Sequence, residues 1–178
     1  MVGARRRTPG VPSRETVVRT LREIAEGSPA LVAVFDARAI AGERHLLSAW
    51  AHLGRARARG ETRLRDRGAE LALYVAGDDQ LPRALGKVGI GDATEQFVVV
   101  AERPLDPAEL LPRFGLEADA SAYPRSPDEA ALDLLGISTI ERATVPRDRW
   151  EALVLERVAM LDLSAPAGRA TGASAPKG

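Results

Sequence analysis

Residues 36–90, which read DARAIAGERHLLSAWAHLGRARARGETRLRDRGAELALYVAGDDQLPRALGKVGI, determine the fold that we expect for this chain. A stripe of apolar residues at helical spacing predicts a long helix over residues 42–59. Alternating apolar residues then predict a strand over residues 70–76. A Gly-Asp-Asp turn at residues 77–79 leads into a short predicted helix over residues 81–88, because an aspartate can cap it and a glycine follows it.

Further helices and strands are expected on both sides of this stretch. Ser13 can cap a helix that ends at Gly27. The other expected elements are buried strands over residues 31–35 and 97–101, a short helix from Asp106-Pro107, a helix with a capping box that begins at Ser126, an edge strand over residues 137–145, and a last helix over residues 146–161.

These elements predict one domain over residues 13–163. Helices and strands mix without strict alternation, so we expect an α+β (mixed α/β) class with a small sheet packed with helices in two layers. Residues 1–12 and 164–178 lack the bulky apolar side chains that would offset the entropy of ordering, so both are expected to be disordered tails. No apolar run is long enough to span a membrane, and no signal-peptide core follows the basic start, which predicts a cytoplasmic location.

Composition excludes several kinds of chemistry. The chain has no cysteine and only two histidines, His45 and His52, so it has no disulfide or thiolate site and no histidine-rich metal site is expected. Neither a Gly-x-Ser-x-Gly nucleophile elbow nor a phosphate-binding loop motif occurs in the sequence. Adjacent aspartates do not readily converge on one ion, so a helix cap is favoured over a metal or catalytic role for Asp78 and Asp79. We therefore expect no enzyme activity, no cofactor and no metal.

The charges are unevenly distributed although the formal net charge is zero. Residues 38–67 carry an excess of five positive charges, and residues 117–141 carry an excess of five negative charges. Such asymmetry either marks an anion-binding face or is an ordinary solvated surface. If it binds RNA, the arginines of the first segment are the best candidates for phosphate contacts.

The order of motifs in residues 36–90 resembles the central block of the TPRKB family, also called PRPK-binding proteins. The block has a helix with spaced alanines, a glycine stop, a polar or basic link and then a glutamate-led apolar strand. The residues that carry the resemblance are Glu70-Leu71-Ala72-Leu73-Tyr74, Gln80-Leu81, Ala84-Leu85, Gly89-Ile90, the later apolar run 97–100 and the terminal helix 146–161. One departure is Asp79, where many members of the family carry a basic residue.

The resemblance implies a non-catalytic subunit of the KEOPS complex, which installs threonylcarbamoyladenosine (t6A) next to the anticodon of certain tRNAs. Such a subunit binds a small atypical kinase that acts as an ATPase, and it helps to recruit tRNA, in part through the 3′ CCA end. Another subunit, an indirect partner, transfers the threonylcarbamoyl group. By the same resemblance, the tRNA-binding residues are expected to be Arg55, Arg59, Arg63, Arg65, Gln80, Arg83 and Lys87.

The kinase is expected to contact a surface formed by the long helix and the terminal helix. The candidate residues are Leu46, Trp50, Leu53, Trp150, Leu153 and Met160, with Leu47 as a further exposed anchor. A helix stripe normally packs into the protein's own core, so each of these residues has that alternative role. Two alternative functions also remain: a generic interaction module without an RNA role, and a metal-dependent enzyme that uses Asp78 and Asp79.

Overall fold

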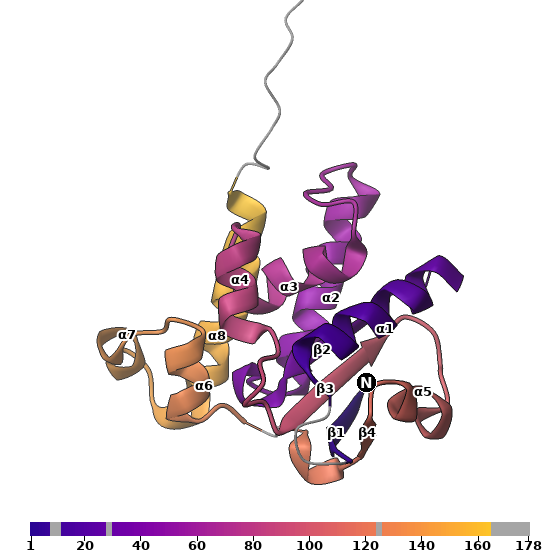
Figure 1. Cartoon of the computed structure of the whole chain (residues 1–178). Coiled ribbons are helices and arrows are strands. Elements are labelled where there is room, and N and C mark those ends of the chain that lie inside the picture. The colour runs from indigo at the N-terminus through magenta and orange to yellow at the C-terminus, as the bar shows by residue number, and fades with distance from the viewer. Residues whose placement is uncertain (8–11, 28–29, 124–125, 165–178) are drawn as a thin grey trace, which may run out of the picture.

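The computed structural model describes residues 1–7, 12–27, 30–123 and 126–164 of the 178-residue chain. Four strands form an antiparallel sheet in the order β2-β3-β1-β4 (Figure 1). The strands are β1 (Val2–Arg6), β2 (Val32–Asp36), β3 (Gln96–Ala101) and β4 (Leu116–Ala118). The helices are α1 (Arg14–Gly27), α2 (Glu43–Ala58), α3 (Arg67–Ala76), α4 (Leu81–Val88), α5 (Pro107–Arg113), α6 (Glu129–Leu134), α7 (Thr139–Ala143) and α8 (Trp150–Met160). Short 3-10 turns occupy Ala37–Ala39, Ala120–Ala122, Arg147–Arg149 and Leu161–Leu163.

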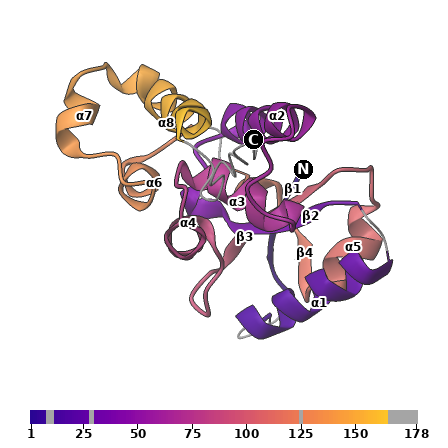
Figure 2. The same ribbon diagram turned by 90° about the horizontal axis from the view of Figure 1, so that it is seen from above.

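Helices cover both faces of the sheet (Figure 2). On one face, α1 and α5 pack against side chains that include Val34, Phe97 and Val99. On the other face, α2, α3, α4, α6 and α8 pack against Phe35 and Val98 in a larger core. Strand side chains alternate between two apolar cores, which is why these strands read as continuous apolar runs. The expected α+β class is confirmed, and the helices form a layer on each side of the sheet where a single helical layer was expected.

Strand β1 corrects the expectation that residues 1–12 are a disordered tail. Residues 2–6 lie inside the sheet, between β3 and β4. The basic run contains one buried arginine: Arg6 donates to the carbonyl oxygens of Thr94 (2.6 Å) and Asp92 (2.5 Å), and its guanidinium lies over the Phe97 ring. These carbonyls and the ring compensate for the loss of water around the charge. The domain therefore includes β1, residues 8–11 lie outside the described residues, and so do residues 165–178 of the other expected tail.

Helix α3 corrects the prediction of a strand over residues 70–76. Its N-cap is Asp66, whose side chain accepts from the Ala69 backbone N–H at 2.7 Å, and its last turn closes at Gly77. Every residue from 70 to 76 is buried. A helix that is buried on all sides carries no amphipathic period, so its apolar run is equally compatible with a buried strand.

The region from 126 to 145 also differs from the prediction. Asp128, rather than Ser126, caps α6 by accepting from the Ala131 N–H at 2.8 Å. The segment expected to be an edge strand is helix α7, where Ser138 and Glu141 form a capping box. The box pairs the Ser138 N–H with the Glu141 carboxylate at 2.8 Å, which satisfies a donor that a strand here would have left at the surface.

Gly77 tests how tightly α3 packs against α8. It has φ of +58°, and a Cβ at this position would lie 2.9 Å from the Cβ of Arg157. We expect Gly77→Ala to lower the free energy of unfolding by about 2 kcal/mol, because left-handed backbone is costly for alanine and the two helices must also move apart. Gly60→Ala is the control, since φ there is +74° and an added Cβ would meet no atom within 4 Å. Equal losses in urea denaturation of the two variants would contradict the close packing.

Candidate functional site

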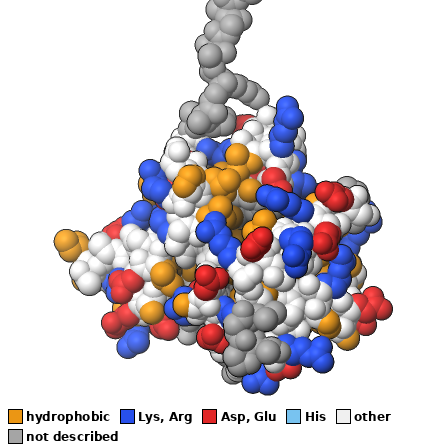
Figure 3. Space-filling model, in the orientation of Figure 1, with side chains coloured by type: hydrophobic (Ala, Val, Ile, Leu, Met, Phe, Trp, Pro, Cys, Tyr) orange, Lys and Arg blue, Asp and Glu red, His pale blue; other side chains and the backbone are white. Residues whose placement is uncertain are grey.

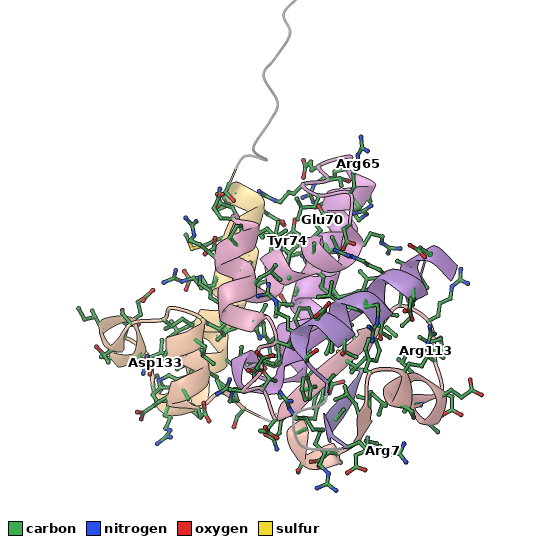
Figure 4. All side chains as sticks on the ribbon, viewed as in Figure 1. Arg7, Arg65, Glu70, Tyr74, Arg113 and Asp133 are labelled. Carbon is green, nitrogen blue, oxygen red and sulfur yellow. The ribbon has the colours of Figure 1, made fainter. Side chains whose placement is uncertain are left out.

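Exposed arginines gather at the end of α2 and in the loop that follows it. Arg55 and Arg59 lie one turn apart on the last part of α2, and Arg65 lies in the loop before α3, at the outer end of the molecule in Figure 4. Among the described residues, Arg55 and Arg65 have no ion-pair partner. These two guanidinium groups are therefore available to bind an external anion.

Two neighbouring arginines, Arg59 and Arg63, make contacts within the chain. Arg59 donates to Glu61 at 2.7 Å and lies 3.9 Å from Asp162, and the hydrogen bond to Glu61 raises the pKa of the guanidinium. Arg63 donates to the carbonyl oxygens of Leu161 and Ser164, both at 2.6 Å. Arg63 therefore holds the turn that follows α8, and this structural role competes with a phosphate contact.

The predicted tRNA-binding residues on α4 lie beside acids. Arg83 donates to Asp78 and Asp79 at 3.0 Å, and Lys87 lies 3.1 Å from the second oxygen of Asp78. Burial would raise the pKa of Asp78, but hydrogen bonds from Arg83, the Gln80 N–H and Lys87 outweigh it and lower the pKa to about 2. Asp78 therefore stays ionised and neutralises much of the local positive charge. Gln80 is exposed and has no such partner.

A polar cavity of about 640 Å³ adjoins this cluster, between the start of α4, α7 and α8. Arg83, Lys87 and Arg157 face it together with Asp78, Asp79, Glu141 and Glu156, so its lining carries both signs of charge. Leu161 and Ser164, whose carbonyls Arg63 binds, also line the cavity. The turn after α8 therefore joins the two predicted groups of tRNA-binding residues into one surface.

Three of the six predicted kinase contacts are buried in the chain's own core. Leu46 and Leu53 of α2 and Trp150 of α8 have 9% of their surface exposed or less, because α2 and α8 pack against each other. They are withdrawn from the candidate interface. Trp50 and Leu153 are half-buried against the same core, whereas Met160 is 54% exposed and Leu47 is 50% exposed. Only these exposed and half-buried residues can contact a partner without a change in the fold.

Two buried polar residues have structural roles, and the sequence assigned none to Glu70. Glu70 is fully buried and accepts hydrogen bonds from Arg57 and from the Arg63 N–H. His45 is also fully buried and joins the start of α2 to the Val75 carbonyl. The sequence signal for this role was Glu70 itself, a single charged residue at the start of the apolar run 70–76, because a buried charge needs a partner.

Within the described ranges, no three acidic or histidine side chains lie close enough together to hold a metal ion. The Asp78 carboxylate accepts from the Gln80 N–H in the turn before α4 and pairs with the side chains of Arg83 and Lys87. These contacts give Asp78 a structural role, which is the alternative to a catalytic one. No helix in the described part of the chain is long and apolar enough to cross a membrane.

No protein-family model matches the chain, and no curated protein sequence matches it. The resemblance to the TPRKB family therefore rests on the order of motifs in residues 36–100 and in the terminal helix.

Proposed function

We propose that this chain is a non-catalytic, cytoplasmic accessory subunit of a KEOPS-type tRNA-modification complex. In this role it binds the small atypical kinase and the tRNA that receives t6A, including the CCA end. The observation that carries the proposal is the pair of exposed, unpartnered arginines, Arg55 and Arg65, beside the segment that resembles the TPRKB family. Guanidinium groups without an internal partner are the groups that phosphates of a polynucleotide bind best.

The kinase would contact the exposed part of α8 and α2. Met160 and Leu153 line the polar cavity, and Leu47 is exposed on α2. Exposed apolar side chains ringed by charges are typical of protein interfaces, in which a few anchors contribute most of the affinity. This assignment keeps the kinase and the tRNA on neighbouring surfaces, joined by the turn after α8.

The proposal is tested by co-purification with the small KEOPS kinase of the same organism, followed by measurement of ATP hydrolysis with and without this chain and tRNA. We expect a stable complex and a tRNA-dependent rise in ATP hydrolysis that the chain alone does not show. A well-folded sample that fails to bind the kinase would refute the proposal. Replacing Met160 with glutamate should weaken the complex, whereas the same change at Ala108, which is exposed on α5 and outside the proposed kinase surface, serves as the matched control.

The tRNA contact makes a separate prediction. We expect Arg55→Ala and Arg65→Ala each to weaken tRNA binding and to reduce the slope of log affinity against log salt by about 1, because each loses one phosphate contact. Arg14→Ala is the control, since Arg14 is exposed on α1 and outside the arginine group. Fluorescence anisotropy with labelled tRNA at several salt concentrations measures both quantities. Equal slopes for all three variants would refute the predicted contacts.

One observation favours a second function, an interaction module without an RNA role. Four of the seven predicted tRNA-binding residues, namely Arg59, Arg63, Arg83 and Lys87, are already bound to acids or carbonyls of the chain. Under this alternative the kinase still binds, but tRNA affinity is no higher than that of the Arg55→Ala, Arg65→Ala double variant.

A further inference from the structure

An apolar groove of about 480 Å³ lies along the outer edge of the sheet, away from the polar cavity. Its walls are α1 on one side and the start of α3 with the end of α4 on the other, and its floor is β2. Figure 3 shows hydrophobic side chains in a hollow on this side of the molecule, with lysine or arginine side chains around it. The apolar wall residues are Val18, Leu21, Ala25, Ala69, Ala72 and Leu85.

Strand β2 is an edge strand whose outer backbone groups face this groove. Leu31 lies opposite Glu102, whose N–H donates to the Leu31 carbonyl at 2.9 Å, so residues 31, 33 and 35 bond to β3. In an antiparallel pair the residues between them point the other way. Val32 and Val34 therefore direct their N–H and C=O groups away from β3, and no backbone group in the described ranges bonds to them. Gly68 at the start of α3 lies close to the Val32 carbonyl, since a Cβ added there would be 3.4 Å from this oxygen.

The rim of the groove carries positive charge. Its lining includes Arg22, Arg65 and Arg67 but only one acid, Asp66, which caps α3. Glu102 binds both terminal nitrogens of Arg67, and the Nε of this arginine is buried without a partner. Arg22 and Arg65 are exposed and have no ion-pair partner among the residues described. The rim is therefore complementary to an acidic ligand.

We propose that this groove binds an extended, acid-flanked peptide of a partner protein, which adds to β2 as a fifth strand. The backbone of the peptide bonds to the free N–H and C=O groups of Val34 and begins beyond Gly68, which lies close to the Val32 carbonyl. Its alternate side chains enter the apolar walls, and its flanking carboxylates meet Arg22 and Arg65. This mode of recognition takes affinity from main-chain hydrogen bonds and specificity from the side-chain pockets.

Two other occupants fit these observations less well. A second copy of the chain, paired edge to edge by a two-fold axis, would bring the arginine rims of the two copies together, which is repulsive. Single-stranded RNA would satisfy the arginines but not the unpaired strand edge. It would also find no stacking platform, because Phe35, the only aromatic residue in the lining, is 3% exposed. This inference does not depend on the KEOPS proposal: Arg65 belongs to the predicted tRNA-binding set as well, but Arg22 and the edge of β2 do not.

The test selects ligands from a phage-displayed library of random peptides on the folded chain. We expect enriched peptides with alternating apolar residues flanked by aspartate or glutamate. The best one is synthesised with and without N-methyl groups on alternate amides, and its affinity is measured by fluorescence anisotropy. Methylation of the amides that face β2 should weaken binding by about tenfold or more, whereas methylation of the other set should not, because only one edge of an added strand bonds to the sheet.

Protein variants complete the test without altering the core. Ala25→Glu and Arg22→Glu place a negative charge in the groove and should each weaken binding by about tenfold. The matched controls are Ala51→Glu on α2 and Arg14→Glu on α1, which are exposed outside the groove and should bind normally. Three outcomes overturn the proposal: no peptide enriched above the Ala25→Glu variant, equal binding by both methylated forms, or displacement of the selected peptide by single-stranded RNA from the Arg65→Ala variant, which lacks the tRNA contact predicted at that residue. Concentration-dependent dimers lost in Arg22→Glu would assign the groove to self-association instead.

Discussion

Glu70→Ala is expected to lower the free energy of unfolding by about 3–5 kcal/mol, the loss typical of breaking a buried ion pair from one side. Glu70 is fully buried on α3 (Figure 4), and its carboxylate accepts hydrogen bonds from Arg57 of α2 and from the Arg63 backbone N–H at 2.7 Å. The variant leaves the Arg63 N–H without its acceptor, and it leaves the Arg57 guanidinium with only the Leu64 carbonyl at 3.5 Å. It also removes the contact by which the arginine-bearing loop is held between α2 and α3.

Glu61→Ala is the matched control for this prediction. Glu61 also pairs with an arginine of α2, Arg59, but both side chains are more than 40% exposed. Exposed pairs contribute only about 0–1 kcal/mol, so this variant should unfold almost as the parent does. Urea denaturation followed by the fluorescence of Trp50 and Trp150 measures both. If the two variants lost the same stability, Glu70 would not be the buried link between α2 and α3.

The second large effect is a loss of stability in mild acid that comes from His45. The imidazole is fully buried, accepts from the Ala41 N–H through Nδ1 at 3.1 Å and donates to the Val75 carbonyl through Nε2 at 2.8 Å. Burial, only partly offset by the hydrogen bond to Val75, lowers the pKa of His45 from 6.5 to about 4. A proton on Nδ1 would also point at the Ala41 N–H, so the folded chain requires the neutral ring.

The direction of the pH effect follows from this lowered pKa. Between about pH 6.5 and pH 4 the unfolded chain binds a proton at His45 that the folded chain does not, so the free energy of unfolding falls as the pH falls. The total loss is about 3 kcal/mol, and below about pH 4 this residue adds no further change. His45→Gln should abolish this part of the pH dependence in urea denaturation, whereas His52→Gln, which leaves His45 in place, should retain it. A slope unchanged in His45→Gln would refute the assignment.

Local signals were sufficient to predict the type and approximate place of eight of the twelve helices and strands in the described ranges. The helix over residues 42–59 has an apolar stripe on one side, and the structure confirms it as α2. Ser13 caps α1 as expected, accepting from the Thr16 N–H at 3.2 Å. These elements lie at the surface, so their patterns record which side meets water. Helix α3 and strand β1 depend on distant contacts instead, and nothing within residues 70–76 or 1–7 records those contacts.

The sequence could predict which residue types make up the candidate site, but not which of these side chains are free to bind a partner. The sequence correctly placed an excess of arginine in residues 38–67, but it could not show that Arg63 reaches across to Leu161 or that Asp78 binds both Arg83 and Lys87. Leu46, Leu53 and Trp150 were proposed as contacts because of the family resemblance, and the alternative role that their helical spacing favours, packing in the chain's own core, is the one that the structure shows. The groove beside β2 could not be predicted from the sequence, because whether a strand lies at the edge of a sheet depends on the order of the strands in space.

The position of β1 has a consequence for the order in which the chain folds. Val2 of β1 pairs with Val99 of β3, which is 97 positions later in the chain, so β1 cannot pair with β3 until that part of the chain has been synthesised. At about 5–20 residues per second, ribosomal synthesis of that distance takes roughly 5–20 s. Helices α1 to α4 can form and collapse during this interval, but the sheet cannot close until β3 emerges. Because such long-range pairing slows folding, the nascent chain spends seconds with an unpaired central strand, when chaperones that hold extended segments have access to it.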